Sequence, residues 1–134
     1  MILLIFLRRI VMTRMIIAGG RDFLDYLRMY TEMNAIIQTI HDNIEIISGC
    51  AKGADTLGMR YAAVMKIPCI KFPADWNKFG KRAGFIRNEE MAKYSISDNS
   101  KGILVAFWDG ESRGTASMIK LAEKYGLEIH VIRY

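Results

Sequence analysis

The chain has only two cysteines among its 134 residues, Cys50 and Cys69, and they lie in unlike sequence contexts. This small number indicates neither a disulfide framework nor a metal site, so a reducing cytoplasm is the expected compartment. The sequence also lacks any block of five or more like charges, which argues against a basic tail for binding nucleic acid. Its apolar runs are too short to span a bilayer. We therefore expect no metal, no cofactor and no membrane association.

The first eleven residues combine an apolar run with two arginines that follow it. A secretory signal has the opposite order of charge and apolar residues and ends in a small-residue cleavage site, so that interpretation is disfavoured. Two interpretations of residues 1–14 stay open. They form an apolar arm that packs on the domain or on a partner subunit, or they are an upstream extension of a protein that starts at Met12 or Met15. We favour the extension, because the globular pattern begins at Met15.

The remaining residues, 15–134, have the length of one domain with one proper core. Over the whole chain, 51% of the residues are hydrophobic and 25% are charged, which is typical of a globular protein. The formal net charge of +5 favours an anionic partner but does not distinguish a mononucleotide from a polymer.

Five short apolar runs alternate with segments of helical periodicity, and the runs span residues 15–18, 44–47, 67–72, 102–106 and 127–132. This alternation predicts an α/β fold: a single Rossmann-like domain with a mostly parallel five-stranded sheet and helices on both faces. In such sheets ligands bind at the carboxyl ends of the strands, near the point where the strand order reverses. The loops after the strands are therefore the candidate site.

The fourth strand is followed by a loop rich in glycine and hydroxyl residues that leads into a helix running to about Gly126. A strand, such a loop and a helix present backbone N–H groups to an anion. Ser112 and Thr115 can cap the helix or bond a phosphate, and Trp108 offers a stacking surface. The candidates from this loop are Trp108, Asp109, Ser112, Arg113, Gly114 and Thr115.

The first strand ends in a tight turn that we expect to open a helix, with Asp22 at the helix start. Arg21 has two open interpretations, a solvated turn residue or a donor that faces a ligand. The candidates from this turn are Gly19, Gly20, Arg21 and Asp22.

The second strand is followed by another small-residue loop, which lacks the Gly-Lys-Ser/Thr order of a Walker sequence. Exposed N–H groups and one ammonium can nonetheless form an anion cradle here. Asp55 either caps the next helix or accepts hydrogen bonds from ribose hydroxyls. The candidates from this loop are Ser48, Gly49, Lys52, Gly53 and Asp55.

A basic loop over residues 77–84 and the helix after it supply the last candidates, Arg82, Gly84, Arg87 and Asn88. The basic side chains here either form a solvated face of the protein or bind an anion near the start of the helix. We expect the loop to close over the site.

Five motifs, at residues 19–23, 48–55, 73–76, 80–91 and 106–119, together resemble the YspA/YpsA-related branch of the SLOG superfamily. The resemblance spans residues 15–133. It implies a Rossmann-like domain that binds nucleotide-derived ligands such as ADP-ribose, NAD-related molecules or cyclic signalling nucleotides. Relatives are often oligomeric, so the resemblance also implies a homo-oligomer.

Some relatives are phosphoribohydrolases with a Pro-Gly-Gly-x-Gly-Thr-x-x-Glu motif, whose Glu is catalytic beside an Arg. Aligned on residues 114–115, that Glu position is Met118, and Arg87 stands for the Arg. A thioether cannot do the acid–base work of a carboxylate. Asp109 or Glu111 could substitute for it, but the resemblance supports binding more firmly than hydrolysis.

Three hypotheses follow. The first is a sensor or sequestering protein for an ADP-ribose-like or cyclic nucleotide, such as a phage protein that counters host nucleotide signalling in anti-phage defence. The second is a hydrolase of an N-glycosidic or phosphoester bond. The third is single-stranded nucleic-acid binding, which is disfavoured because the basic residues are expected at loop tips and not along a stripe.

Overall fold

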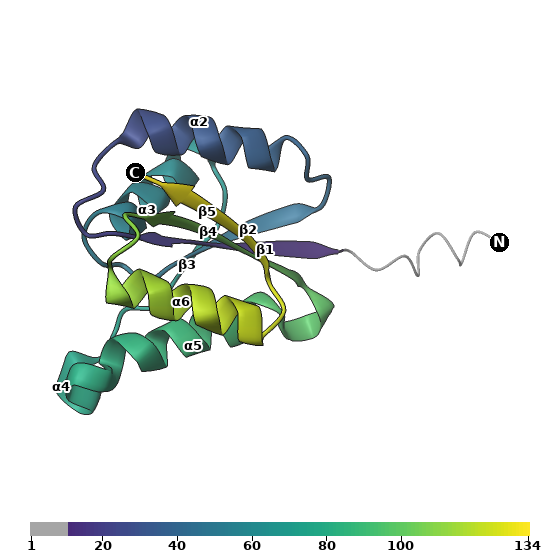
Figure 1. Ribbon diagram of the computed structural model, residues 1–134. Helices are drawn as coiled ribbons and strands as arrows, with labels where there is room; N and C mark the ends of the chain where they lie inside the picture. The colour runs from purple at the N-terminus through teal and green to yellow at the C-terminus, as the bar shows by residue number, and fades with distance from the viewer. Residues whose placement is uncertain (1–10) are drawn as a thin grey trace.

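The computed structural model describes residues 11–134, in which strands and helices alternate along the chain (Figure 1). The apolar arm or extension expected over residues 1–14 lies outside the described part of the chain, except for its last four residues. None of the helices within residues 11–134 is both long and apolar enough to cross a membrane.

The sheet has five strands in the order β3-β2-β1-β4-β5. All neighbouring strands are parallel, so the predicted α/β class is confirmed, and the sheet is wholly parallel where we expected it to be mostly so. The strand order reverses between β1 and β4, which are neighbours at the centre of the sheet. The strands are β1 (Met12–Gly19), β2 (Asn43–Ser48), β3 (Cys69–Lys71), β4 (Lys101–Trp108) and β5 (Glu128–Arg133).

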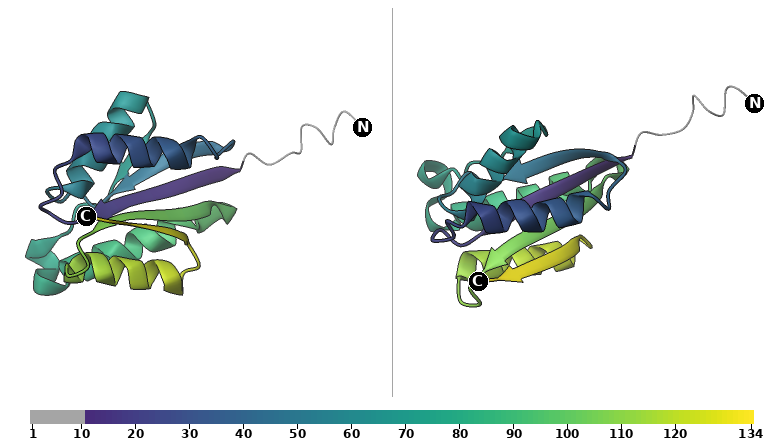
Figure 2. Two further views of the ribbon diagram at one scale, coloured as in Figure 1. Left: turned by 45° about the horizontal axis from the view of Figure 1, so that its top comes forward. Right: turned by 90° about the horizontal axis from the view of Figure 1, so that it is seen from above.

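Helices cover both faces of the sheet (Figures 1 and 2). Side chains of β1 alternate between the two layers: Met15 and Ile17 pack with α2 (Tyr26–Ile37) and α3 (Ala54–Met65). Ile16 and Ala18 pack on the opposite face with α5 (Ala83–Ser95) and α6 (Arg113–Lys124). This alternation is what a strand buried on both faces requires. Three short elements complete the chain: α4 (Trp76–Phe79), η1 (Gly80–Arg82) and η2 (Ser97–Asn99).

Most strand boundaries differ from the expected runs by one or two residues, and two boundaries differ by more. Strand β1 begins at Met12, three residues before the apolar run at 15–18, because Met12 to Arg14 already pair with β2; Thr13 and Arg14 are buried although they are polar. Helix α2 begins at Tyr26, whereas we expected Asp22 to start it. Asp25 is the residue that caps it, accepting a hydrogen bond from the backbone N–H of Arg28 at 3.0 Å. Asp22 instead accepts a hydrogen bond from the Tyr134 hydroxyl.

A buried arginine joins the strands to the α5 layer at the edge of the sheet opposite the carboxyl ends of the strands. Arg14 is 9% exposed, and its Nε donates to Glu45 Oε1 at 2.8 Å. Its Nη1 donates to the carbonyl of Tyr94 at 2.9 Å and to Ser97 Oγ at 2.7 Å. The Tyr94 hydroxyl donates to the same Glu45 oxygen, and its ring lies under the guanidinium. Every charge in this network is therefore paired.

We expect Arg14→Met to lower the free energy of unfolding by about 3 kcal/mol, because it removes the only cation within hydrogen-bonding distance of the half-buried Glu45 carboxylate and the bonds that Arg14 donates to Tyr94 and Ser97 among the described residues. Urea unfolding at neutral pH measures the change. Lys93→Met, on the exposed side of α5, is the matched control and should change stability by less than about 0.5 kcal/mol. Equal effects of the two substitutions would show that the Arg14 network is not what holds α5 to the sheet.

Candidate functional site

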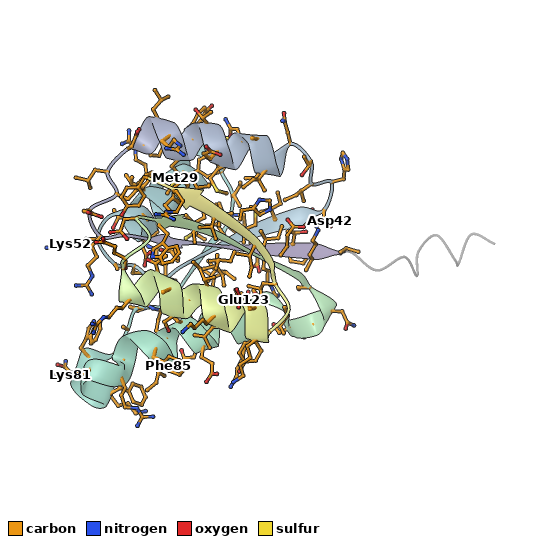
Figure 3. The ribbon with its side chains drawn as sticks, in the orientation of Figure 1. Met29, Asp42, Lys52, Lys81, Phe85 and Glu123 are labelled. Atoms are coloured by element: carbon orange, nitrogen blue, oxygen red, sulfur yellow. The ribbon has the colours of Figure 1, made fainter. Side chains whose placement is uncertain are left out.

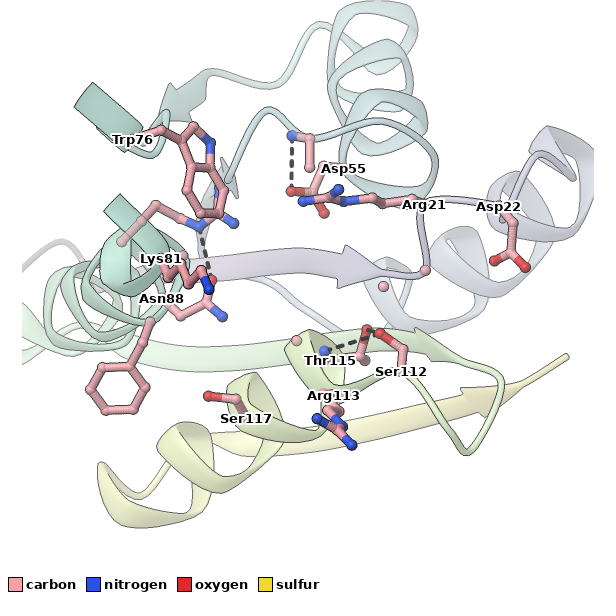
Figure 4. A pocket seen from close by; sticks show the side chains of 17 residues that line it. Arg21, Asp22, Asp55, Trp76, Lys81, Asn88, Ser112, Arg113, Thr115 and Ser117 are labelled. Carbon is pink, nitrogen blue, oxygen red and sulfur yellow. Dashed lines mark hydrogen bonds between the residues drawn. The ribbon is translucent and has the colours of Figure 1, made fainter. Parts of the chain in front are cut away.

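A cavity of about 580 Å³ lies at the carboxyl ends of β1 and β4, where the strand order reverses (Figure 4). Its volume is within the range of small-molecule sites. The loops after β1, β2 and β4 and the first turns of α5 contribute to its wall. Of the residues predicted from the sequence, it brings together Gly19, Gly20, Arg21, Asp22, Asp55, Gly84, Arg87, Asn88, Ser112, Arg113, Gly114 and Thr115.

The other predicted residues lie elsewhere. Gly49 and Lys52 line a smaller adjoining cavity of about 350 Å³, which shares Arg21 and Arg87 with the main cavity. Five predicted residues line neither cavity: Ser48, Gly53, Arg82, Trp108 and Asp109. The basic loop expected to close over the site is instead mostly helical, formed by α4 and η1, and it contributes Lys81 to the wall while Arg82 is exposed.

Gly20 ties three loops together at the base of the cavity. Its backbone N–H donates to the carbonyl of Phe107 at the end of β4, at 3.0 Å. Its carbonyl accepts from the N–H of Ala54, at the start of α3, at 3.1 Å. A Cβ on Gly53, whose φ is +78°, would overlap that carbonyl. The loops can approach this closely only without side chains there, which gives Gly53 a structural role next to the cavity.

The loop after β4 is shaped by Trp108 and Asp109, and neither side chain faces the cavity. Asp109 Oδ1 accepts the N–H groups of Glu111 and Ser112, both at 2.8 Å. These two hydrogen bonds hold the pKa of Asp109 below its usual range. Trp108 Nε1 donates to the carbonyl of Ser112 at 3.0 Å. The pair therefore sets the course of the chain into α6.

The first turn of α6 points unpaired donors at the cavity. Ser112 caps the helix, and its Oγ lies 3.5 Å from the N–H of Thr115. The N–H groups of Arg113 and Gly114, which line the cavity, have no acceptor among residues 11–134. Free N–H groups and the positive end of the helix dipole favour an anion at this place.

Asp55 is a buried carboxyl in the wall of the cavity, 6% exposed. Its Oδ2 accepts the N–H of Ala51 at 3.2 Å, and Oδ1 makes no hydrogen bond within the described residues. Burial raises the pKa of Asp55 to about 6, although the Ala51 N–H and the guanidiniums of Arg87 and Arg21 oppose the rise. A carboxyl that titrates near neutral pH in a cleft can exchange a proton or accept a hydroxyl.

Arg87 is held beside Asp55 by bonds to the loop after β2. Its Nη1 donates to the carbonyl of Gly49, and its Nε donates to Asn88 Oδ1 at 2.9 Å. A Cβ on Gly49 would lie 2.5 Å from Arg87 Nη1 and 2.8 Å from Asp55 Oδ2. Gly49 therefore lets the guanidinium and the carboxyl approach each other. Burial lowers the pKa of Arg87.

Sequence reasoning missed five residues of the main wall: Ala51, Trp76, Lys81, Phe85 and Ser117. Trp76 is 51% exposed and stands opposite the start of α6, next to Lys81 (Figure 4). Its ring lies 3.5 Å from where a Cβ on Gly84 would be. Asp75 begins the short helix α4 by accepting the N–H of Lys78, and so positions Trp76. The motif at residues 73–76, which ends in Trp76, was the sequence signal that could have identified this residue.

The wall has four cationic side chains, from Arg21, Lys81, Arg87 and Arg113, against the carboxyls of Asp22 and Asp55. Such a balance attracts an anion, and the exposed Trp76 ring can stack on a base. Within residues 11–134, no three His, Cys, Asp or Glu side chains are grouped as a metal site would need.

Met118, which aligns with the catalytic Glu of the hydrolase motif, is buried in the core between the sheet and α6, at 1% exposure. It does not line the cavity, and neither do Asp109 or Glu111. Asp55 is thus the better-placed acid.

We expect the free energy of unfolding of Asp55→Asn to rise relative to that of wild type as the pH rises. Folding raises the pKa of Asp55 from 3.8 to about 6, so the stability linked to its proton is complete below about pH 4 and is lost as the pH passes through about 6. Asn keeps an acceptor for Ala51 but does not titrate. Urea unfolding between about pH 4 and pH 8 should show the variant gaining up to about 3 kcal/mol relative to wild type. The exposed control Glu111→Gln should show no such trend, and a parallel pH dependence of Asp55→Asn and wild type would contradict the prediction.

Comparison with known proteins agrees with the resemblance noted in the sequence. A family model described as the YspA, cpYpsA-related SLOG family matches residues 13–79, from β1 through α4. The Gene 61 protein of Mycobacterium phage D29 is 28% identical over 123 residues, which cover 88% of this chain and 94% of the relative. No solved structure gives a significant match. The chain belongs to the YspA, cpYpsA-related SLOG family.

Proposed function

We propose that the protein binds a nucleotide-derived small molecule in the cavity between β1 and β4 and acts as a sensor or sequestering protein. Family membership suggests the broad ligand class, nucleotide-related molecules. The observation that carries the proposal is the wall itself: unpaired N–H groups at the start of α6, four cations and one exposed tryptophan converge on one cavity. The finer choice, an ADP-ribose-like, NAD-related or cyclic nucleotide, is part of the proposal.

The wall suggests how such a ligand lies. A phosphate accepts the N–H groups of Arg113 and Gly114, because they are the unpaired donors and the helix dipole favours a negative charge there. The base stacks on Trp76, on the opposite side of the cavity. The free oxygen of Asp55 accepts a ribose hydroxyl. Arg21, which makes no hydrogen bond within the described residues, supplies charge at the mouth.

Hydrolysis of the bound nucleotide is the second candidate, and Asp55 is the observation that favours it. A carboxyl with a pKa of about 6 beside Arg87 can serve as a general acid or base. Binding ranks first because the position of the hydrolase Glu is the buried Met118. The phage relative is in keeping with the more specific idea that the protein removes a host signalling nucleotide by binding it.

Arg21→Ala and Trp76→Ala should each weaken binding about tenfold or more, because each removes one polar or stacking contact with the ligand. Calorimetric titration with ADP-ribose, NAD and cyclic ADP-ribose measures the affinity. Arg60→Ala, which removes an arginine from α3 outside the cavity, is the matched control and should leave the affinity unchanged.

The same samples decide between binding and turnover. Chromatography after incubation should return the ligand intact. Cleaved products that disappear with Asp55→Asn would make the protein a hydrolase. Unchanged affinity in both cavity variants would place the ligand elsewhere. Light scattering after size exclusion tests the expected homo-oligomer, and a monomer mass would contradict it.

A further inference from the structure

A groove between α5 and α6 continues the main cavity away from the strand ends. It has a volume of about 480 Å³ and shares Phe85, Arg113 and Ser117 with the cavity. Figure 3 places Phe85 and Lys81 near the corner where α4 meets α5. Phe85 is 51% exposed, and Ala116 and Leu121 supply further apolar surface. The groove therefore offers apolar surface and opens directly from the proposed nucleotide site.

The charged side chains of the groove are all cationic: Arg113, Lys120 and Lys124. They follow one face of α6, because positions i, i+7 and i+11 lie close to one line on a helix. Lys124 pairs with Glu89 Oε2 at 3.5 Å, whereas Lys120 and Arg113 make no ion pair within residues 11–134. Lys120 therefore offers an unpaired charge two turns beyond Arg113. This is a short basic stripe that sequence reasoning did not identify.

Among the described residues, the far end of the groove offers no free positive charge, because Lys124 is paired there with Glu89. Glu89 lies there, and its Oε2 accepts both the Tyr125 hydroxyl at 2.9 Å and the Lys124 ammonium. The hydrogen bond from Tyr125 holds the pKa of Glu89 below its usual range, so this group is a carboxylate at neutral pH. A chain of phosphates running past Lys120 would meet this ion pair and not another free cation of the described residues. The groove thus suits one additional anionic unit and not a polymer.

We propose that the ligand is a dinucleotide whose second nucleotide lies in the groove between α5 and α6, with its phosphate on Lys120 and its base against Phe85. This inference rests on the proposed function, because it takes the first nucleotide to occupy the main cavity. It goes further by naming the ligand class and by assigning Lys120 as a residue that distinguishes a dinucleotide from a mononucleotide. Charge complementarity and continuity with the cavity support it.

The test compares the mononucleotides AMP and GMP with the linear dinucleotides pApA and pGpG by calorimetric titration. We expect at least one dinucleotide to bind about tenfold tighter than its mononucleotide, since it adds a charged and a stacking contact. Lys120→Glu should remove most of that difference and leave mononucleotide binding within about twofold, while Lys120→Arg should retain it. Lys93→Glu, an exposed lysine on α5 outside the groove, is the control for net charge.

The outcomes separate the two proposals. Equal affinity for mononucleotides and dinucleotides, or equal loss for both in Lys120→Glu, would overturn the groove and leave the cavity as the nucleotide site. Binding of none of the four nucleotides would overturn the dinucleotide inference, whereas only failure of ADP-ribose, NAD and cyclic ADP-ribose to bind as well would overturn the cavity as a nucleotide site. Tighter binding of a twelve-residue oligothymidylate than of any dinucleotide, with steep salt dependence, would also overturn the inference in favour of a single-stranded polymer.

Discussion

The arrangement of the loops around the cavity depends on the two backbone hydrogen bonds of Gly20. Its N–H is bonded to the end of β4 and its carbonyl to the start of α3, so one residue after β1 holds the two flanking loops in place. The contacts require backbones to approach without side chains, which is why Gly53 lies against Gly20. Because these bonds are between backbone groups, this part of the wall does not depend on side-chain rotamers. Side-chain bonds of Asp109, Trp108 and Ser112 then position the donors at the start of α6.

Charged side chains are removed from solvent at both ends of the sheet, but only at one end are they fully paired. At the end without the cavity, Arg14 is buried with every hydrogen-bonding group close to a partner, so it stabilises the layer of α5. At the cavity, Asp55 is buried and Arg87 is half-buried beside an open space, and their pKa values shift toward the neutral forms. Such groups reduce the stability of the empty protein. A ligand that supplies hydrogen bonds to them would recover part of that free energy, and this supports a binding role for the cavity.

The sequence was sufficient to predict those site residues whose place follows from strand ends. Gly19 to Asp22 and Ser112 to Thr115 line the cavity because β1 and β4 are neighbours and parallel. Trp108, which we expected to offer a stacking surface, lines neither cavity: it is the last residue of β4, and its indole bonds back to the loop at Ser112. Trp76, and not Trp108, presents its indole at the cavity wall. It follows β3 at the sheet edge, and only the fold of α4 and η1 brings it over the cavity.

The sequence alone determined the class of fold, the five strands and the family, because the alternation of apolar runs with helical periodicity and the spacing of small residues are local properties of the chain. It also determined that the loops after β1, β2 and β4 would meet at one edge of the sheet. The tertiary structure decided which side chains face the cavity, how deeply Asp55 is buried, and that α5 and α6 form a groove continuous with it. Those properties depend on how segments far apart in the chain pack together. Local sequence patterns do not specify the resulting distances and exposed areas.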